Sequence, residues 1–212
     1  MALSGLRERK KRATRAALHH AAMRLFVERG YAATTIDDIA AAADVSRATV
    51  FSYFPTKEDL VFGDAPLAIE ALADALRAAP DVLAGVREWA RELGAPIEPE
   101  SEHGGWIEPE LILQRRLAHA VPAIAARRLQ ILRAAEDVIA QALVERGTDP
   151  LSARFAAATC VAGLDATEDA AAAELERGPE ADPSAADAPL DRALEFARAG
   201  LAGIGSRARG RR

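Results

Sequence analysis

Residues 34–60 read TTIDDIAAAADVSRATVFSYFPTKEDL, and this stretch contains the helix signals that decide the fold. Thr35 followed by Asp38 is a capping pattern, in which a hydroxyl and a carboxylate each satisfy a free backbone N–H at the start of a helix. The pattern predicts a short helix from Ile36 to about Ala43.

A second short helix follows after a tight turn. Asp44 is one of the few residues besides glycine that tolerate a left-handed backbone, so it suits the turn. Ser46 is a favourable N-cap. Pro55 disfavours a helical conformation in the residue before it. Together these signals predict a helix over residues 47–54.

Two short helices joined by a tight turn form the helix-turn-helix arrangement, whose second helix enters the major groove of DNA. Val45, Val50 and Phe54 are expected to pack inward. The outer face is then expected to hold the DNA contacts Arg47, Ala48, Thr49, Phe51, Ser52 and Tyr53. Arginine can bind guanine O6 and N7 together, and the methyl group of Thr49 suits a thymine methyl. Thr35, Tyr53 and Lys57 are expected to hold phosphates, helped by the N-termini of the adjoining helices.

Helical signals continue on both sides of this stretch. Apolar residues at helical spacing predict a helix through Leu18 and Phe26 that ends at Gly30. Thr56 with Asp59 predicts a fourth helix that begins at Lys57 and is bent or broken near Gly63 and Pro66. Further helices are predicted over residues 82–93, 110–120, 122–146, from 150 onward, and 190–202, with loops over residues 95–110 and 177–189. With no strand pattern found, the fold class is all-α, with about nine helices.

Charge divides the chain unevenly. Residues 1–60 carry ten Lys/Arg and seven Asp/Glu, whereas the other 152 residues carry 17 and 25. Most of the positive charge lies in LRERKKRATR, residues 6–15, which suits a phosphate-binding arm or, alternatively, a solvated disordered tail. The expected organisation is a basic arm (1–12), a helix-turn-helix DNA-binding domain (13–60), a ligand-binding and dimerisation domain (61–205) and a basic tail (206–212).

The composition excludes several classes of protein. Half of the residues are apolar, which suits a globular chain, and no apolar run approaches the roughly 20 residues of a membrane span. The single cysteine, Cys160, excludes an internal disulfide and is expected to be buried and unreactive. No membrane association is expected, and the expected location is the cytoplasm.

An enzyme is the main competing class. The sequence contains no glycine-rich phosphate loop, nucleophile elbow or Cys/His pair. His103 and His119 lack the i, i+4 spacing of a helical metal site. We therefore expect no catalytic residue, no metal site and no cofactor.

Residues 17–60 resemble the N-terminal DNA-binding domain of TetR-like transcriptional repressors. The resemblance is carried by three blocks in order: FVERGY, TTIDDIA and VSRATVFSYFPTKEDL. The chain departs from the family pattern at Asp44, where glycine is usual, and at Phe51, where tyrosine is frequent. Without the tyrosine hydroxyl, any contact from Phe51 is expected to be apolar, for instance to a thymine methyl.

The resemblance implies an all-helical homodimer. Three N-terminal helices would bind a palindromic double-stranded DNA operator, a fourth would connect, and a C-terminal domain would bind a small molecule and pair through its last two helices. The implied function is a transcriptional regulator, a repressor released by its ligand. Helix four, with Gly63 and Pro66, is the candidate for coupling the two domains.

The C-terminal domain contains no motif of its own. Aromatic bodies with a few polar groups are typical of small-molecule sites, and the candidate ligand-binding residues on that basis are Trp89, Trp106, Gln114, His119 and Phe155. For Trp89 and Phe155 a place in the core is equally compatible with the sequence. A helix-turn-helix protein whose C-terminal domain binds another protein instead of a small molecule is a further alternative.

Overall fold

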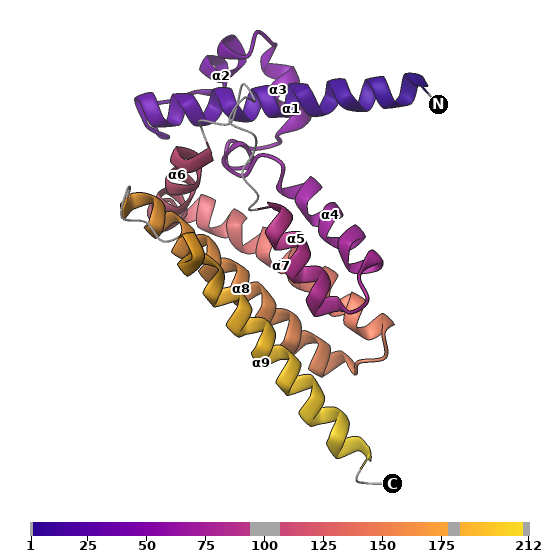
Figure 1. Cartoon of the computed structure of the whole chain (residues 1–212). Coiled ribbons are helices and arrows are strands. Elements are labelled where there is room, and N and C mark those ends of the chain that lie inside the picture. The colour runs from indigo at the N-terminus through magenta and orange to yellow at the C-terminus, as the bar shows by residue number, and fades with distance from the viewer. Residues whose placement is uncertain (1, 94–106, 178–182, 210–212) are drawn as a thin grey trace. The chain divides into compact units, whose positions relative to one another are not determined.

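The computed structural model describes residues 2–93, 107–177 and 183–209, and all the regular structure in these ranges is helical (Figure 1). The helices are α1 (Ala2–Arg29), α2 (Ile36–Ala42), α3 (Arg47–Tyr53), α4 (Ala65–Ala78), α5 (Val82–Leu93), α6 (Ile107–Ala120), α7 (Pro122–Glu145), α8 (Pro150–Arg177) and α9 (Pro183–Arg209). One turn of 3-10 helix, η1, covers Asp59–Val61. The predicted all-α class is confirmed.

The chain forms two compact units. The first contains residues 1–65 and 116–128, and the second contains residues 66–115 and 129–212. We call the first unit the head and the second unit the body. The corner at which α6 ends and α7 begins therefore belongs to the head, where Arg127 Nε lies 2.6 Å from the buried carboxylate of Asp59. The sequence did not indicate that this corner joins the N-terminal helices.

The core of the head forms where α1, α2 and α3 meet. Leu18, Phe26, Ile39, Val50 and Phe54 are all at most 2% exposed. The first two lie on the predicted apolar stripe of α1, and the last two lie on the predicted inner face of α3. Because burying one such side chain contributes about 1.5–3 kcal/mol, this small cluster is enough to hold two very short helices on α1.

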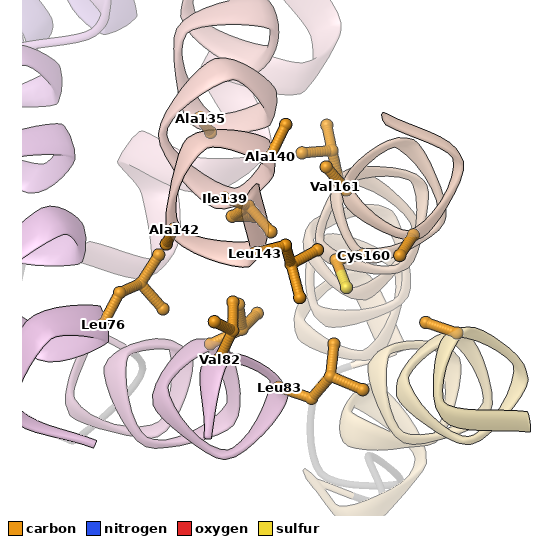
Figure 2. Close-up of a cluster of buried hydrophobic side chains, with 14 of the residues drawn as sticks. Leu76, Val82, Leu83, Ala135, Ile139, Ala140, Ala142, Leu143, Cys160 and Val161 are labelled. Carbon is orange, nitrogen blue, oxygen red and sulfur yellow. The ribbon is translucent and has the colours of Figure 1, made fainter. Parts of the chain in front are cut away.

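The core of the body is assembled from several helices, as Figure 2 shows. Leu76 of α4, Val82 of α5, Leu143 of α7 and Cys160 of α8 are all buried in one cluster. Burial raises the pKa of the Cys160 thiol to about 12, because the thiolate is poorly solvated there. The expectation of a buried cysteine is confirmed, and its low reactivity stays a prediction.

The predicted start of the fourth helix is wrong, whereas the predicted break is confirmed. The Thr56 and Asp59 side chains do exchange capping bonds with each other's backbone N–H, at 3.2 and 2.9 Å. Only the single turn η1 follows them, because Gly63 adopts a left-handed conformation with φ of 44°. α4 begins at Ala65, so Gly63 lies outside it and Pro66 lies in its first turn, which proline tolerates.

Other boundaries also differ from the predictions. α1 begins at Ala2, so it includes the basic run, whose role as a phosphate-binding arm stays a prediction. α6 begins at Ile107 instead of Glu110; the preceding residues 94–106 lie outside the described ranges. α9 begins at Pro183 instead of Leu190 and continues to Arg209, through part of the predicted basic tail.

The early start of α9 is explained by a contact with the neighbouring helix α8. Pro189 lies inside the helix, where a proline removes one backbone hydrogen bond and disturbs its neighbours. Leu190 N–H instead donates to Thr167 Oγ1 of α8 at 3.1 Å. Since the neighbouring helix supplies this acceptor, α9 continues through a proline that the sequence had indicated as part of a loop.

Within the described ranges, no helix combines the length and the apolar character that a membrane span requires.

Candidate nucleic-acid interface

The capping box at the start of α2 fixes the first half of the helix-turn-helix. Thr35 Oγ1 accepts from Asp38 N–H at 3.1 Å, and Asp38 Oδ2 accepts from Thr35 N–H at 2.8 Å. The hydrogen bonds from Thr35 lower the pKa of the Asp38 carboxyl. The predicted cap is confirmed, and a cap of this kind contributes about 0.5–2 kcal/mol to helix stability.

The turn between α2 and α3 has the predicted geometry. Asp44 has φ of 51°, the one positive value among the described residues other than glycine. Val45 N–H then donates to Ala40 O at 3.0 Å, which closes the turn. Ser46 caps α3 by accepting from Thr49 N–H at 3.0 Å. α3 ends at Tyr53, one residue earlier than predicted.

α3 has one buried and one exposed side. Val50 is fully buried, whereas Arg47, Ala48, Phe51 and Ser52 are exposed. Thr49 and Tyr53 are half-buried, and Thr35 is exposed at the start of α2. The predicted division between an inner face and an outer face of this helix is confirmed. Whether the outer residues contact DNA stays a prediction.

Arg47 has two neighbours within the head. Its Nη1 lies 2.8 Å from Asp37 Oδ2 of α2. Its guanidinium carbon lies 5.4 Å from the centre of the Phe51 ring, one turn further along α3. The one cation of this helix is therefore held beside both an acid and an aromatic ring.

The hydroxyl groups of the predicted contact residues already form local hydrogen bonds. Thr35 donates to Asp38 Oδ2 at 2.5 Å, and Ser52 donates to Thr49 O at 2.7 Å. The hydroxyls of Thr49 and Ser46 lie 2.8 Å apart. Because a hydroxyl has one proton, a phosphate must accept it in place of these partners or bond to a backbone N–H instead.

Lys57 is anchored on Tyr31. Its Nζ donates to Tyr31 O and lies 4.1 Å from the centre of the Tyr31 ring. Partial burial lowers the pKa of the Lys57 ammonium. Tyr31 in turn donates its hydroxyl to Glu58 at 3.0 Å, and burial with this acidic neighbour raises the pKa of the phenol. A lysine ammonium has three donors, so this anchoring leaves donors for a phosphate.

Arg15 was not among the predicted site residues, because in the sequence it is one of six basic residues in the run 6–15. Arg15 donates to Tyr53 O and Gly63 O, both at 2.7 Å, and to Asp64 Oδ1 at 3.0 Å. Its guanidinium carbon also lies 4.2 Å from the centre of the Phe54 ring. Arg15 thus ties α1 to the end of α3 and to the residues just before α4. The available signal was its position three residues before Leu18, on the buried side of α1.

The predicted ligand-binding residues lie in different environments. Trp89 is 8% exposed in the core of the body and donates Nε1–H to Ala68 O at 3.1 Å. Phe155 is 65% exposed on α8, which is typical of a surface position and not of an enclosed pocket. Gln114 is half-buried, and His119 is exposed on the part of α6 that belongs to the head. Trp106 lies outside the described residues. A pocket role for these five residues stays a prediction.

A helix-turn-helix whose second helix exposes a basic, apolar and hydroxyl-bearing face defines the class of helix-turn-helix DNA-binding proteins. Residues 18–62 match the model of the family described as bacterial regulatory proteins, tetR family. Over these residues, which include the second part of α1, α2 and α3, the chain is similar to the TetR family.

The relatives agree over different lengths. The HTH-type transcriptional regulator TcmR of Streptomyces glaucescens is 40% identical over 76 residues, which are 36% of this chain and 34% of that protein. The matched part is thus about a third of the length of this curated relative. The structure of Thermus thermophilus FadR, a TetR family transcriptional repressor in complex with lauroyl-CoA, is 25% identical with a TM-score of 0.55. That comparison covers 88% of this chain and 94% of FadR.

A more distant structure shows how far the fold extends. A transcriptional regulator from Rhodococcus sp. Rha1 is 19% identical with a TM-score of 0.54, over 88% of this chain and 96% of its own. At this identity the likeness concerns the fold only. The shared fold therefore extends beyond the head into the helices of the body.

Proposed function

We propose that the protein is a sequence-specific DNA-binding transcriptional regulator, a repressor that a small molecule releases from a palindromic operator. One observation carries the proposal: α3 is fixed on the head by Val50 and exposes Arg47, Ala48, Phe51 and Ser52. If α3 were only a solvated helix without a partner, its exposed face would not require an arginine, a large aromatic ring and a hydroxyl group together. The protein would act in the cytoplasm, and regulation would be its function in place of catalysis.

The proposed DNA contacts have two kinds of role. Arg47 would bind a guanine edge, and Ala48, Thr49 and Phe51 would contact thymine methyl groups. Phosphate contacts would set the position of the head on the duplex without carrying sequence information. These contacts are assigned to Thr35, Ser52, Tyr53 and Lys57.

A homodimer would bring two heads to one operator. α8 and α9 lie side by side within the body (Figure 1), and they carry the most exposed large apolar side chains of the described residues. These are Leu151, Phe155 and Phe196, at 65%, 65% and 73% exposed. Exposed apolar groups on neighbouring helices suit a second copy of the chain. A two-fold dimer then matches a palindrome with half-sites about 34–36 Å apart.

The ligand would act through the body. FadR, which is similar to this chain over most of its length, was crystallised with lauroyl-CoA. A ligand of this chain can release DNA only by binding a second conformation more tightly than the DNA-bound one. α4 is the proposed coupling element, because Arg15 bonds both Tyr53 at the end of α3 and Asp64 just before α4. A shift of α4 would thereby reach the recognition helix.

Selection of bound sequences from random duplex DNA by the purified protein tests this function. The expected result is enrichment of one palindrome. Failure to enrich any sequence would contradict the proposal.

A ligand and a protein partner are then distinguished on the selected duplex. Loss of binding on addition of a small molecule, with no co-purifying protein, supports the ligand. A co-purifying protein and no small-molecule effect would support the alternative of a protein partner.

A further inference from the structure

The ion pair between Asp37 and Arg47 places a negative charge at the proposed DNA interface. A negative charge there is unfavourable for binding DNA, so its presence requires an explanation. Asp37 is 66% exposed, in the first turn of α2. A carboxylate at this position repels phosphates and weakens binding to every DNA sequence alike. If its only role were to stabilise the start of α2, it would need no contact with Arg47.

The geometry of the pair shows what the contact does to Arg47. Asp37 Oδ2 accepts from Nη1 of Arg47 at 2.8 Å. A guanidinium has five N–H donors in a rigid plane, and Nε–H and Nη2–H form the edge opposite Nη1. That edge has the two parallel donors that bind guanine O6 and N7 together. The ion pair thus uses one donor and leaves a complete reading edge.

Phe51 limits the same side chain from a second direction. Its ring lies 5.4 Å from the guanidinium carbon of Arg47, within the range of a cation–π contact, and Phe51 itself is 40% exposed. A free arginine side chain has many rotamers, and ordering it on binding costs entropy. With Asp37 and Phe51 on two sides, part of that ordering precedes DNA binding.

We propose that Asp37 is a specificity-determining positioning residue, which with Phe51 holds Arg47 so that its Nε and Nη2 edge remains available to a guanine. The inference rests on the proposed function and deepens it. Asp37 contributes to discrimination and not to overall affinity: its charge disfavours all DNA, and its bond to Arg47 favours the correct base. Phe51 occupies a position where tyrosine is frequent in the family, and it has no hydroxyl to donate to a phosphate. Its role in this arrangement requires no phosphate contact.

The test compares Asp37→Asn with Asp44→Asn. Both changes remove one exposed negative charge from the helix-turn-helix. Of the two acids, Asp37 bonds Arg47, whereas Asp44 lies in the turn. Asparagine tolerates the left-handed conformation of Asp44, so the control keeps the turn. The probes are the duplex selected by the wild-type protein and an unselected duplex of equal length. The quantity compared is the ratio of the two affinities.

We expect Asp37→Asn to lower this ratio by about two- to fivefold, the range of an exposed ion pair. Asp44→Asn should leave the ratio unchanged while raising the affinity for both duplexes. Phe51→Leu should lower the ratio in the same direction as Asp37→Asn. In an Arg47→Ala background Asp37→Asn should have no further effect on the ratio, because Asp37 acts through Arg47.

Two results would overturn the inference: an unchanged ratio for Asp37→Asn, or an equal fall in the ratio with and without Arg47. Retained affinity for the unselected duplex shows that each variant is folded. Arg47→Ala by itself distinguishes a failure of the proposed function from a failure of the role given to Asp37. If it leaves the ratio unchanged, the reading role in the proposed function fails; if it lowers the ratio and Asp37→Asn does not, only the role of Asp37 fails.

Discussion

Arg15 and Arg47 belong to the same small head and have different surroundings. The side chain of Arg15 is 17% exposed and bonds backbone carbonyls, whereas that of Arg47 is 58% exposed and bonds an exposed carboxylate. A buried guanidinium that satisfies carbonyl groups stabilises the fold, and an exposed one is available to a partner. Sequence composition counts both as one positive charge, so it could not distinguish their roles.

For Arg47→Ala we expect a loss of about 1–3 kcal/mol in binding free energy on the selected operator, with relaxed preference at one base pair. The reason is the loss of two donors to one base edge. Titration of operator duplexes that differ at single positions measures the effect. An equal loss on operator and random DNA would assign Arg47 to phosphates instead.

For Arg15→Ala we expect the head to be destabilised by about 1–3 kcal/mol, because the carbonyl oxygens of Tyr53 and Gly63 lose their donor. Urea unfolding measures the change, with the exposed Arg12→Ala as the control of equal charge. Equal stability of the two variants would mean that the bonds of Arg15 contribute nothing to the fold.

At the scale of the helices, a boundary could be predicted when neighbouring residues in the sequence determine it. A boundary that depends on another helix could not be predicted. The caps of α2 and α3 depend on side chains three residues apart, and both were predicted correctly. The start of α9 depends on Thr167 of another helix, which no pattern around Pro189 reveals. In the site, the exposed face of α3 followed from its periodicity. The pairing of Arg47 with Asp37 joins two helices, so it was not predictable.

Gly163 lies at a close approach between α8 and α9. A Cβ at this position would overlap Ala193 Cβ and lie 3.2 Å from the backbone of Leu190. Neither atom can rotate away, so Gly163→Ala should destabilise the protein by about 1–2 kcal/mol, in spite of the better helix propensity of alanine.

The control for this substitution is Gly200→Ala on α9, where an added Cβ meets no described atom within 4 Å. It should be neutral or stabilise the protein by up to about 1 kcal/mol. Urea unfolding of both variants measures the difference. If Gly163→Ala were as stable as Gly200→Ala, the two helices would not approach as closely as described.

On the scale of the whole molecule, α6 and α7 each contribute residues to both the head and the body. The division at residues 115/116 and 128/129 has no counterpart in composition or charge along the chain. It follows from contacts such as that between Arg127 and Asp59, which lie far apart in the sequence. Under the proposed function two chains act together at this scale, because each head would read one half-site.

The affinity for operators of altered spacing tests this central claim most directly. Inserting about five base pairs between the halves of the selected palindrome turns one half-site to the opposite face of the duplex, half a helical turn away. If two heads of one dimer read the two halves together, the affinity should fall close to that for random DNA, and an insertion of a different sequence but equal length should do the same. An unchanged affinity for the lengthened operator would contradict the account.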